Sequence, residues 1–314
     1  MKKTLAILAA AMFAGAAAAQ DTKVVIAISG WTGFAPLTLA KEAGLYAKRG
    51  LDVTIKKVPQ KDRHLVIASG DVQCAATTVE TWIGWNASGV ATTQIFQLDK
   101  SYGADGMVVK PGISKISDLK GKTVAADAPG TATYFTLAWM LKKNGLSIKD
   151  VKVVNLSPQA AANAMIAGNN DIDAAMTYEP YLSAVRAKPE AGKIIATTLD
   201  YPMIMDTFGC TPKFLAENPK AAKALADGYF DALEMIKAEP KKSFEIMGAD
   251  VKSTGEAFEG SQKYLRWQDR AANEKFFAGE HAQFSKEAGD LLLEIGIVKQ
   301  LPDMSKLSDT RFLK

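Results

Sequence analysis

The fold is decided by the stretch KVVIAISGWTGFAPLTLAKEAG, residues 23–44. Its β-branched opening predicts a buried strand over residues 23–28. Serine and glycines interrupt the pattern, and Pro36 then suits the first turn of a helix that ends at Gly44. This order is typical of the strand–loop–helix unit of α/β proteins.

The same unit recurs along the chain. Further strands are expected at residues 53–55, 72–77, 107–109, 123–126, 151–155 and 174–176. Further helices are expected at residues 63–69, 79–87, 132–144, 158–167 and 182–187. Strands that alternate with helices form parallel sheets joined by helical crossovers. The sequence therefore predicts an α/β fold made of two similar units in series.

The end of the chain follows a different pattern. Helices are expected at residues 219–238, 240–247, 253–267 and 284–294. Because such a tail cannot build a third sheet, we expect it to pack on the first unit. The segments 97–105 and 197–208 contain Gly, Asp and Pro residues and are predicted to be the crossings between the two units.

The N-terminus has the layout of a secretory signal peptide over residues 1–19. Lys2 and Lys3 precede an apolar run, and three alanines stand before Gln20. The run is short for a permanent membrane span, although a membrane-anchored N-terminus is the alternative interpretation. We therefore expect export of a mature chain that begins near Gln20.

Composition and charge exclude several classes of protein. The net charge of +4 is modest and its basic residues are scattered, which argues against a nucleic-acid partner. Cys74 and Cys210 are too far apart for a zinc motif, so no metal site is expected. In an exported chain these two cysteines either pair or remain buried thiols.

The motifs of an enzyme are missing from the sequence. The chain has no Gly-x-Ser-x-Gly elbow, no His-Glu-x-x-His motif and no phosphate loop. Its two histidines, His64 and His281, have no evident acid or nucleophile partner. We therefore expect a protein that is not an enzyme and uses no cofactor.

Four segments resemble one family. They are residues 33–53, with AKEAGLY at 40–46 and RGLDV at 49–53; ISDLKGKTV at 116–124; NAMIAG at 163–168 followed by DIDA at 171–174; and YEPY at 178–181. In this order they are similar to periplasmic solute-binding proteins of ABC transporters for nitrate, taurine, aliphatic sulfonates and thiamine-precursor pyrimidines. The likeness covers nearly the whole mature chain.

The resemblance implies a type II periplasmic binding protein, with two Rossmann-like lobes joined by a two-strand hinge. Lobe 1 would comprise residues 20–100 and 206–314, and lobe 2 residues 101–205, with the helical C-terminal tail packed on lobe 1. The implied partners are a small-molecule ligand and an ABC permease in the inner membrane. We expect the mature protein to be a periplasmic monomer.

A two-lobed receptor binds its solute where strand ends and helix starts face each other. Trp31 and Phe34 follow the first strand and could form an apolar wall; the alternative for Trp31 is packing in the core. Thr78 and Glu80 follow the strand at 72–77 and are candidate contacts. Their alternative role is helix capping and a favourable charge in the first helical turn.

The turn at 127–134 is the expected oxyanion seat. It leads into a helix whose free N–H groups and the hydroxyls of Thr131 and Thr133 could hold an anion. The resembling sulfonate receptors hold the oxyanion with this turn and often carry serines at these two positions. Asp127 and Tyr134 belong to the same candidate set. Simple capping by Thr131 is the alternative.

Carboxylates complete the candidate set. Glu179 follows a strand of the second unit and could neutralise a ligand ammonium or contact the opposite lobe. Asp99, Asp105 and Asp206 lie in the crossings, where solvated hinge charge is the alternative.

An anion seat combined with carboxylates favours a zwitterion, and we expect taurine or another sulfonate. Nitrate, a thiamine-precursor pyrimidine or a small cationic nitrogen compound remain alternatives. Another class stays open too: an exported or pyrimidine-synthesis enzyme of the same fold.

Overall fold

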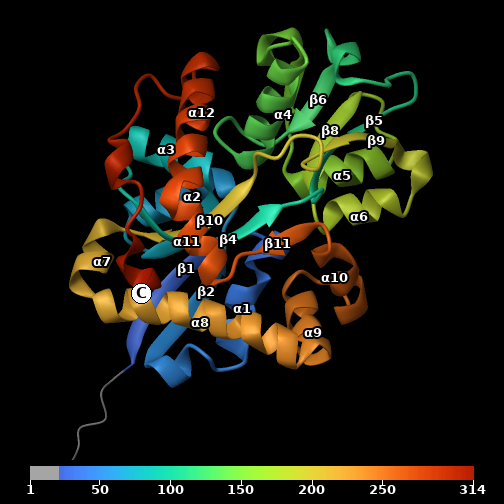
Figure 1. The fold of residues 1–314 in the computed structure, drawn as a ribbon. Helices are drawn as coiled ribbons and strands as arrows, with labels where there is room; N and C mark the ends of the chain where they lie inside the picture. The colour runs from blue at the N-terminus through green and yellow to red at the C-terminus, as the bar shows by residue number, and fades with distance from the viewer. Residues whose placement is uncertain (1–20) are drawn as a thin grey trace, which may run out of the picture.

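The structure, a computed structural model, describes residues 21–314. The predicted signal peptide at residues 1–19 lies outside the described residues. The chain forms two α/β lobes that lie side by side, as Figure 1 shows. Each lobe is built on its own mixed sheet, which confirms the predicted fold class.

Lobe 1 is the part built on the larger sheet. Within residues 21–314 this sheet has six strands in the order β11-β4-β10-β3-β1-β2. They are β1 (Thr22–Ile28), β2 (Leu51–Lys57), β3 (Cys74–Thr78), β4 (Thr93–Ser101), β10 (Met205–Cys210) and β11 (Leu265–Trp267). Strand β1 is parallel to β2 and β3, whereas β10 is antiparallel to β3 and β4. The prediction of wholly parallel sheets is therefore wrong for the strands next to the crossings.

Lobe 2 is the part built on the smaller sheet. Within the described residues its five strands have the order β7-β6-β8-β5-β9. They are β5 (Asp105–Val109), β6 (Thr123–Ala126), β7 (Lys152–Asn155), β8 (Ala174–Tyr178) and β9 (Lys193–Thr197). Strand β6 is parallel to both of its neighbours, and β5 is antiparallel to both of its own.

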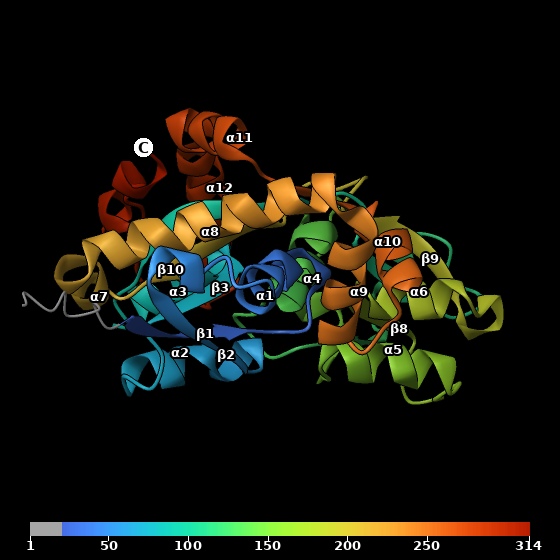
Figure 2. The same ribbon diagram turned by 90° about the horizontal axis from the view of Figure 1, so that it is seen from below.

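Helices cover both sheets. Those of the first unit are α1 (Ala35–Glu42), α2 (Gln60–Ala68) and α3 (Val79–Ala87), and those of lobe 2 are α4 (Ala132–Lys143), α5 (Pro158–Ile166) and α6 (Tyr181–Arg186). The tail contains α7 (Pro212–Glu217), α8 (Pro219–Ala238), α9 (Pro240–Asp250), α10 (Gly255–Gln262), α11 (Arg270–Lys275) and α12 (His281–Glu294). Figure 2 shows α8 running along lobe 1, where it packs on α1.

The chain passes between the sheets twice. It leaves lobe 1 after β4 and enters β5 at Asp105, and it returns between the end of β9 at Thr197 and the start of β10 at Met205. Because β4 and β10 pair antiparallel, the two passages start from neighbouring strands of lobe 1.

The tail differs from its prediction in two respects. The helix expected at 253–267 ends at Gln262, and Leu265–Trp267 forms the short edge strand β11 instead. This segment pairs with β4, whose edge would otherwise lack hydrogen bonds. In addition to α3 of lobe 1, α12 contacts α4 of lobe 2: the rings of Phe284 and Trp139 lie 6.1 Å apart.

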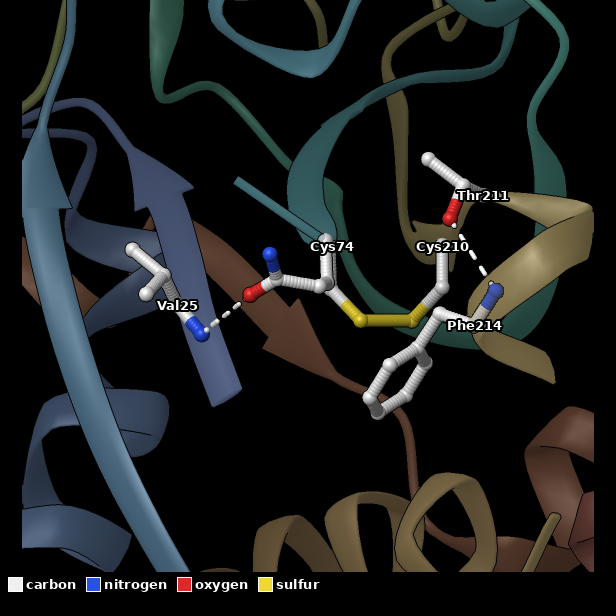
Figure 3. The surroundings of a disulfide bond; sticks show 6 residues. Val25, Cys74, Cys210, Thr211 and Phe214 are labelled. Carbon is white, nitrogen blue, oxygen red and sulfur yellow. Dashed lines mark hydrogen bonds between the residues drawn. A yellow bond between two sulfur atoms is a disulfide. The ribbon is translucent and has the colours of Figure 1, made fainter. Parts of the chain in front are cut away.

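The two cysteines are bonded to each other. Cys74 in β3 and Cys210 in β10 lie opposite each other in the antiparallel pair, and Figure 3 shows the disulfide between them. It links residues 136 positions apart in the sequence, both of them buried in the lobe 1 core. Of the two alternatives left open by the sequence, the structure shows the pair. Among the described residues, no helix has the length and apolar character needed to cross a membrane.

Candidate ligand-binding site

A cleft between the lobes contains two adjoining cavities. The inner cavity has a volume of about 20 Å³ and is lined by Ser29, Trp31, Phe34, Gln60, Arg63, Thr77, Thr78, Asp105, Ala132, Tyr178, Ile204 and Asp206. The outer cavity, of about 260 Å³, is lined by Ser29, Gly30, Lys57, Val58, Pro59, Gln60, Asp127, Ser157, Pro158, Gln159, Tyr178 and Tyr181. An inner volume of this size holds little more than one water molecule, so a larger solute also needs the outer cavity or a shift of the lining side chains.

Strand ends and helix starts of both lobes supply this lining. Trp31 follows β1, Thr78 ends β3, Tyr178 ends β8 and Ala132 begins α4. Loops at strand ends are the expected position of a ligand in an open α/β sheet. The cleft is therefore the candidate binding site.

Aromatic side chains form one wall of the inner cavity. Trp31 and Tyr178 come from opposite lobes and meet edge to face, with ring centroids 5.4 Å apart. Phe34 lines the same cavity and is buried. The indole Nε1 of Trp31 donates to the Asp99 carboxylate, at 3.1 Å from Oδ1. This bond holds the polar edge of the indole ring against an acid.

Four buried acids gather beside this wall. Glu80 lies in α3, Asp99 in β4, Asp105 at the start of β5 and Asp206 in β10, and none is more than 3% exposed. Burial raises the pKa of Glu80 and of Asp99 to about 8 and that of Asp105 to about 7. Burial, followed by repulsion from Asp99, also raises the pKa of Asp206.

These acids have few positive partners. Arg63 is the one basic side chain among the described residues that line the inner cavity, and its guanidinium donates to the carbonyls of Val58 and Ala76. Within residues 21–314, Oδ2 of Asp105 and Oε2 of Glu80 have no hydrogen-bond partner. Buried polar atoms are normally paired, so Asp105, the one of these two acids that lines the cavity, suits a ligand that brings a positive charge or N–H donors.

The hydrogen bonds of the turn at 127–134 differ from those predicted for an oxyanion seat. The Thr131 hydroxyl donates to the Ala128 carbonyl at 2.8 Å, and the Thr133 hydroxyl accepts from the N–H of Asp127 at 3.2 Å. The N–H of Ala132 donates to Oε1 of Gln60 in lobe 1, at 3.1 Å. The Thr131 hydroxyl and the N–H of Ala132 are thus engaged by the protein itself, whereas the Thr133 hydroxyl serves there as an acceptor.

Glu179 also has internal partners. It is fully buried, forms an ion pair with Arg186 and accepts a bond from the N–H of Ser183 at 3.1 Å. The same Arg186 guanidinium donates to the carbonyl of Gly103 in the first passage between the lobes. Glu179 therefore stabilises the passage next to the cleft, and its neighbour Tyr178 is the residue that reaches the cavity.

The structure brings together part of the predicted set. Trp31, Phe34 and Thr78 line the inner cavity and Asp127 lines the outer one. Among the described lining residues of either cavity, Glu80, Thr131, Thr133, Tyr134 and Glu179 do not occur.

Sequence reasoning missed the lining residues Gln60 and Arg63, and within the candidate segment 178–180 it assigned the contact to Glu179 instead of Tyr178. Pro59 directly before Gln60 was a usable signal, because proline commonly precedes or opens a helix. Arg63, which shares a short charged helix with Lys61 and Asp62, gave no signal of burial.

The described residues contain no group of three or more His, Cys, Asp or Glu side chains that could hold a metal ion.

Comparisons with known proteins agree with this geometry. The model of the family described as NMT1/THI5 like matches residues 31–243. The taurine-binding periplasmic protein of Escherichia coli (strain K12) is 30% identical over 234 residues, which cover 71% of this chain and 69% of that protein.

Solved structures share the fold. The alkanesulfonate-binding protein SsuA from Xanthomonas axonopodis pv. citri, bound to MOPS, superposes with a TM-score of 0.79 at 16% identity, over 93% of this chain and 100% of that chain. The periplasmic nitrate-binding protein NrtA from Synechocystis PCC 6803 gives a TM-score of 0.73 at 17% identity, over 91% of this chain and 84% of that chain. At these identities the likeness shows the fold alone. The family match and the E. coli relative go further, and they show that the chain belongs to the NMT1/THI5-like family.

Proposed function

We propose that this protein is the solute-binding component of an ABC importer. After export through the signal at residues 1–19, it would capture a small solute between its lobes and deliver it to an inner-membrane permease. The family match, the periplasmic location named for the E. coli relative and the cleft between two lobes support this proposal. Residues 101–105 and 197–205 would serve as the hinge of a monomer that binds no nucleic acid.

The ligand in this proposal is a small solute with a protonated nitrogen. The observation that carries it is Asp105, which lines the inner cavity and whose buried Oδ2 has no hydrogen-bond partner among the described residues. An ammonium there would stabilise the ionised form of Asp105, and Trp31, Phe34 and Tyr178 would enclose its alkyl part or face the cation. Thr78 would add a hydroxyl contact.

Taurine is the first compound to test, because it carries an ammonium and is the named ligand of the E. coli relative. The structure supports its ammonium end more directly than its sulfonate end, since two donors of the 127–134 turn, the Thr131 hydroxyl and the N–H of Ala132, already have partners within the protein. A cationic amine or an aminopyrimidine is the second candidate, and the same acids and aromatic wall favour it.

Calorimetry on the purified mature protein would separate these ligands. The panel is taurine, ethanolamine, ethanesulfonate, nitrate and 4-aminopyrimidine, because ethanolamine keeps the ammonium and ethanesulfonate keeps the sulfonate. We expect binding of the compounds with a basic nitrogen, which are taurine, ethanolamine and 4-aminopyrimidine. The two simple anions, ethanesulfonate and nitrate, should bind at least tenfold more weakly. Tight binding of nitrate or ethanesulfonate would contradict the proposed ligand class.

We propose no catalytic role. His64 packs beside Trp85, and His281 is buried against Phe276, where desolvation lowers its pKa to about 4. Neither histidine is among the described residues that line the cleft. The described lining thus offers no histidine base, and the binding role named for the E. coli relative favours binding over an enzyme of the same fold.

A further inference from the structure

Gln60 forms hydrogen bonds to both lobes across the cleft. It is the first residue of α2, and its side chain lines both the inner and the outer cavity. Its Nε2 donates to the hydroxyls of Thr77 at 2.8 Å and Thr81 at 2.9 Å, both in lobe 1. Its Oε1 accepts the N–H of Ala132, the first residue of α4 in lobe 2.

The surrounding hydroxyls set the orientation of this amide. Two hydroxyl oxygens hold the NH₂ group, and the Thr81 hydroxyl continues to that of Thr78, 2.9 Å away, which in turn donates to Glu80. A flipped amide would place its NH₂ group against the N–H of Ala132, two donors facing each other. The carbonyl oxygen therefore points at the N-terminus of α4.

This oxygen occupies the position that an anion would take. The N-terminus of a helix attracts oxyanions through its free N–H groups and its dipole. At α4 the first N–H donates to Gln60, the Thr131 hydroxyl donates to the Ala128 carbonyl, and the Thr133 hydroxyl accepts from the N–H of Asp127. The carbonyl of Gln60 gives the helix an acceptor that carries only a partial negative charge, next to a cluster of acids.

We propose that Gln60 is a specificity-determining residue: it substitutes for a ligand oxyanion at α4, disfavours anionic solutes and stabilises the closed lobes. This inference rests on the proposed function, because it assumes that a solute binds in the same cleft. The neutral side chain of Gln60 on α2 would thus determine whether the cleft prefers cationic or anionic solutes.

Two substitutions separate the possible roles. Gln60→Ala removes the acceptor and frees the N–H of Ala132, whereas Gln60→Glu keeps an acceptor and adds a charge that repels anions. Gln283→Ala, at an exposed position of α12, is the matched control for a glutamine-to-alanine change. Circular dichroism would verify that each variant folds.

Calorimetry with ethanolamine and ethanesulfonate gives the first readout. In Gln60→Ala we expect the ratio of the two dissociation constants to shift at least tenfold toward ethanesulfonate, the loss expected for about one charge-assisted hydrogen bond. Gln60→Glu and Gln283→Ala should keep the wild-type preference. An unchanged ratio in Gln60→Ala, or the same shift in Gln60→Glu, would overturn the inference.

Hydrogen–deuterium exchange without ligand gives a second readout. The Ala132 amide should exchange at least tenfold faster in Gln60→Ala than in the wild type, but not in Gln60→Glu. Unchanged exchange in Gln60→Ala would overturn the inference even if solutes bind. If the wild type binds no compound of the panel, the proposed function fails; if it binds ethanolamine and the ratio stays constant, only the role of Gln60 fails.

Discussion

Asp105, Glu80 and Asp99 connect the binding site to the stability of the protein. Burial raises the pKa of Asp105 to about 7 and those of Glu80 and Asp99 to about 8, so the folded chain holds protons that the unfolded chain has released. The stability that these groups contribute is complete below their unfolded pKa values and is lost as the pH rises through about 7 to 8. The ligand-free protein should therefore lose on the order of a few kcal/mol of unfolding free energy between pH 5 and pH 8.5.

Chemical denaturation at several pH values would measure this loss. Asp105→Asn should flatten part of the profile, because it removes one of the titrating groups. Asp118→Asn is the control: Asp118 is exposed and hydrogen bonds from Ser114 lower its pKa, so it stays ionised across the window. A wild-type profile that is flat or that rises with pH would show that the acids are not buried as described.

At the same scale, the sequence predicted which loops form the cleft better than which side chains enter it. Trp31, Phe34 and Thr78 were predicted because they follow strands, and the end of a strand is a property of local sequence. Gln60 was missed because the helix was expected to begin at residue 63, three positions too late. Tyr178 and Glu179 are adjacent in the sequence. Only the fold decides that Glu179 pairs with Arg186 while Tyr178 lines the cavity.

The short 3₁₀ turn Thr32–Phe34 holds the aromatic wall in place and gives an element-scale prediction. A Cβ on Gly33 would lie 2.2 Å from Oδ2 of Asp99 and 2.2 Å from Nε1 of Trp31, so Gly33→Ala must displace this hydrogen-bonded pair. We expect at least a tenfold loss of solute affinity and a destabilisation of about 1–3 kcal/mol.

Gly84→Ala in α3 is the matched control for this substitution. Its Cβ would meet nothing within 4 Å among the described residues, so the helix should gain about 0.5–1 kcal/mol without a change in affinity. Calorimetry and thermal unfolding of the two variants would check the pair. Normal affinity in Gly33→Ala would show that Trp31 and Asp99 do not contribute to binding.

The elements themselves were predicted where the pattern is local. The helices at 79–87 and 219–238 match α3 and α8, and the strand at 123–126 matches β6. Strands β4 and β10 were interpreted as crossings because they carry polar residues such as Gln97, Asp99 and Asp206, which are buried only through pairing with distant strands. The strand β11 likewise depends on the free edge of β4, which no local pattern reveals.

For the whole molecule, the contact between α4 and α12 provides a way to change closure without touching the cavity. The Trp139 ring lies 6.1 Å from that of Phe284, and the Lys142–Glu294 ion pair joins the same two helices. None of these four side chains is among the described residues that line the cleft. Because α12 packs on α3 of lobe 1 while α4 belongs to lobe 2, opening of the cleft would separate these rings.

Trp139→Ala should therefore shift the lobes toward the open arrangement. A substitution that changes only this equilibrium multiplies every dissociation constant by the same factor, since each ligand needs the same closed state. We expect about a tenfold loss of affinity for taurine and for ethanolamine alike, given the energy of an aromatic contact. Small-angle scattering should show a larger radius of gyration than for the wild type.

Val154→Ala, at a solvent-exposed position of β7 in lobe 2, is the control and should change neither the affinities nor the radius of gyration. A change in the ratio of the two constants would mean that α4 acts on the ligand directly, and constant affinities with an unchanged radius would mean that α12 has no part in closure.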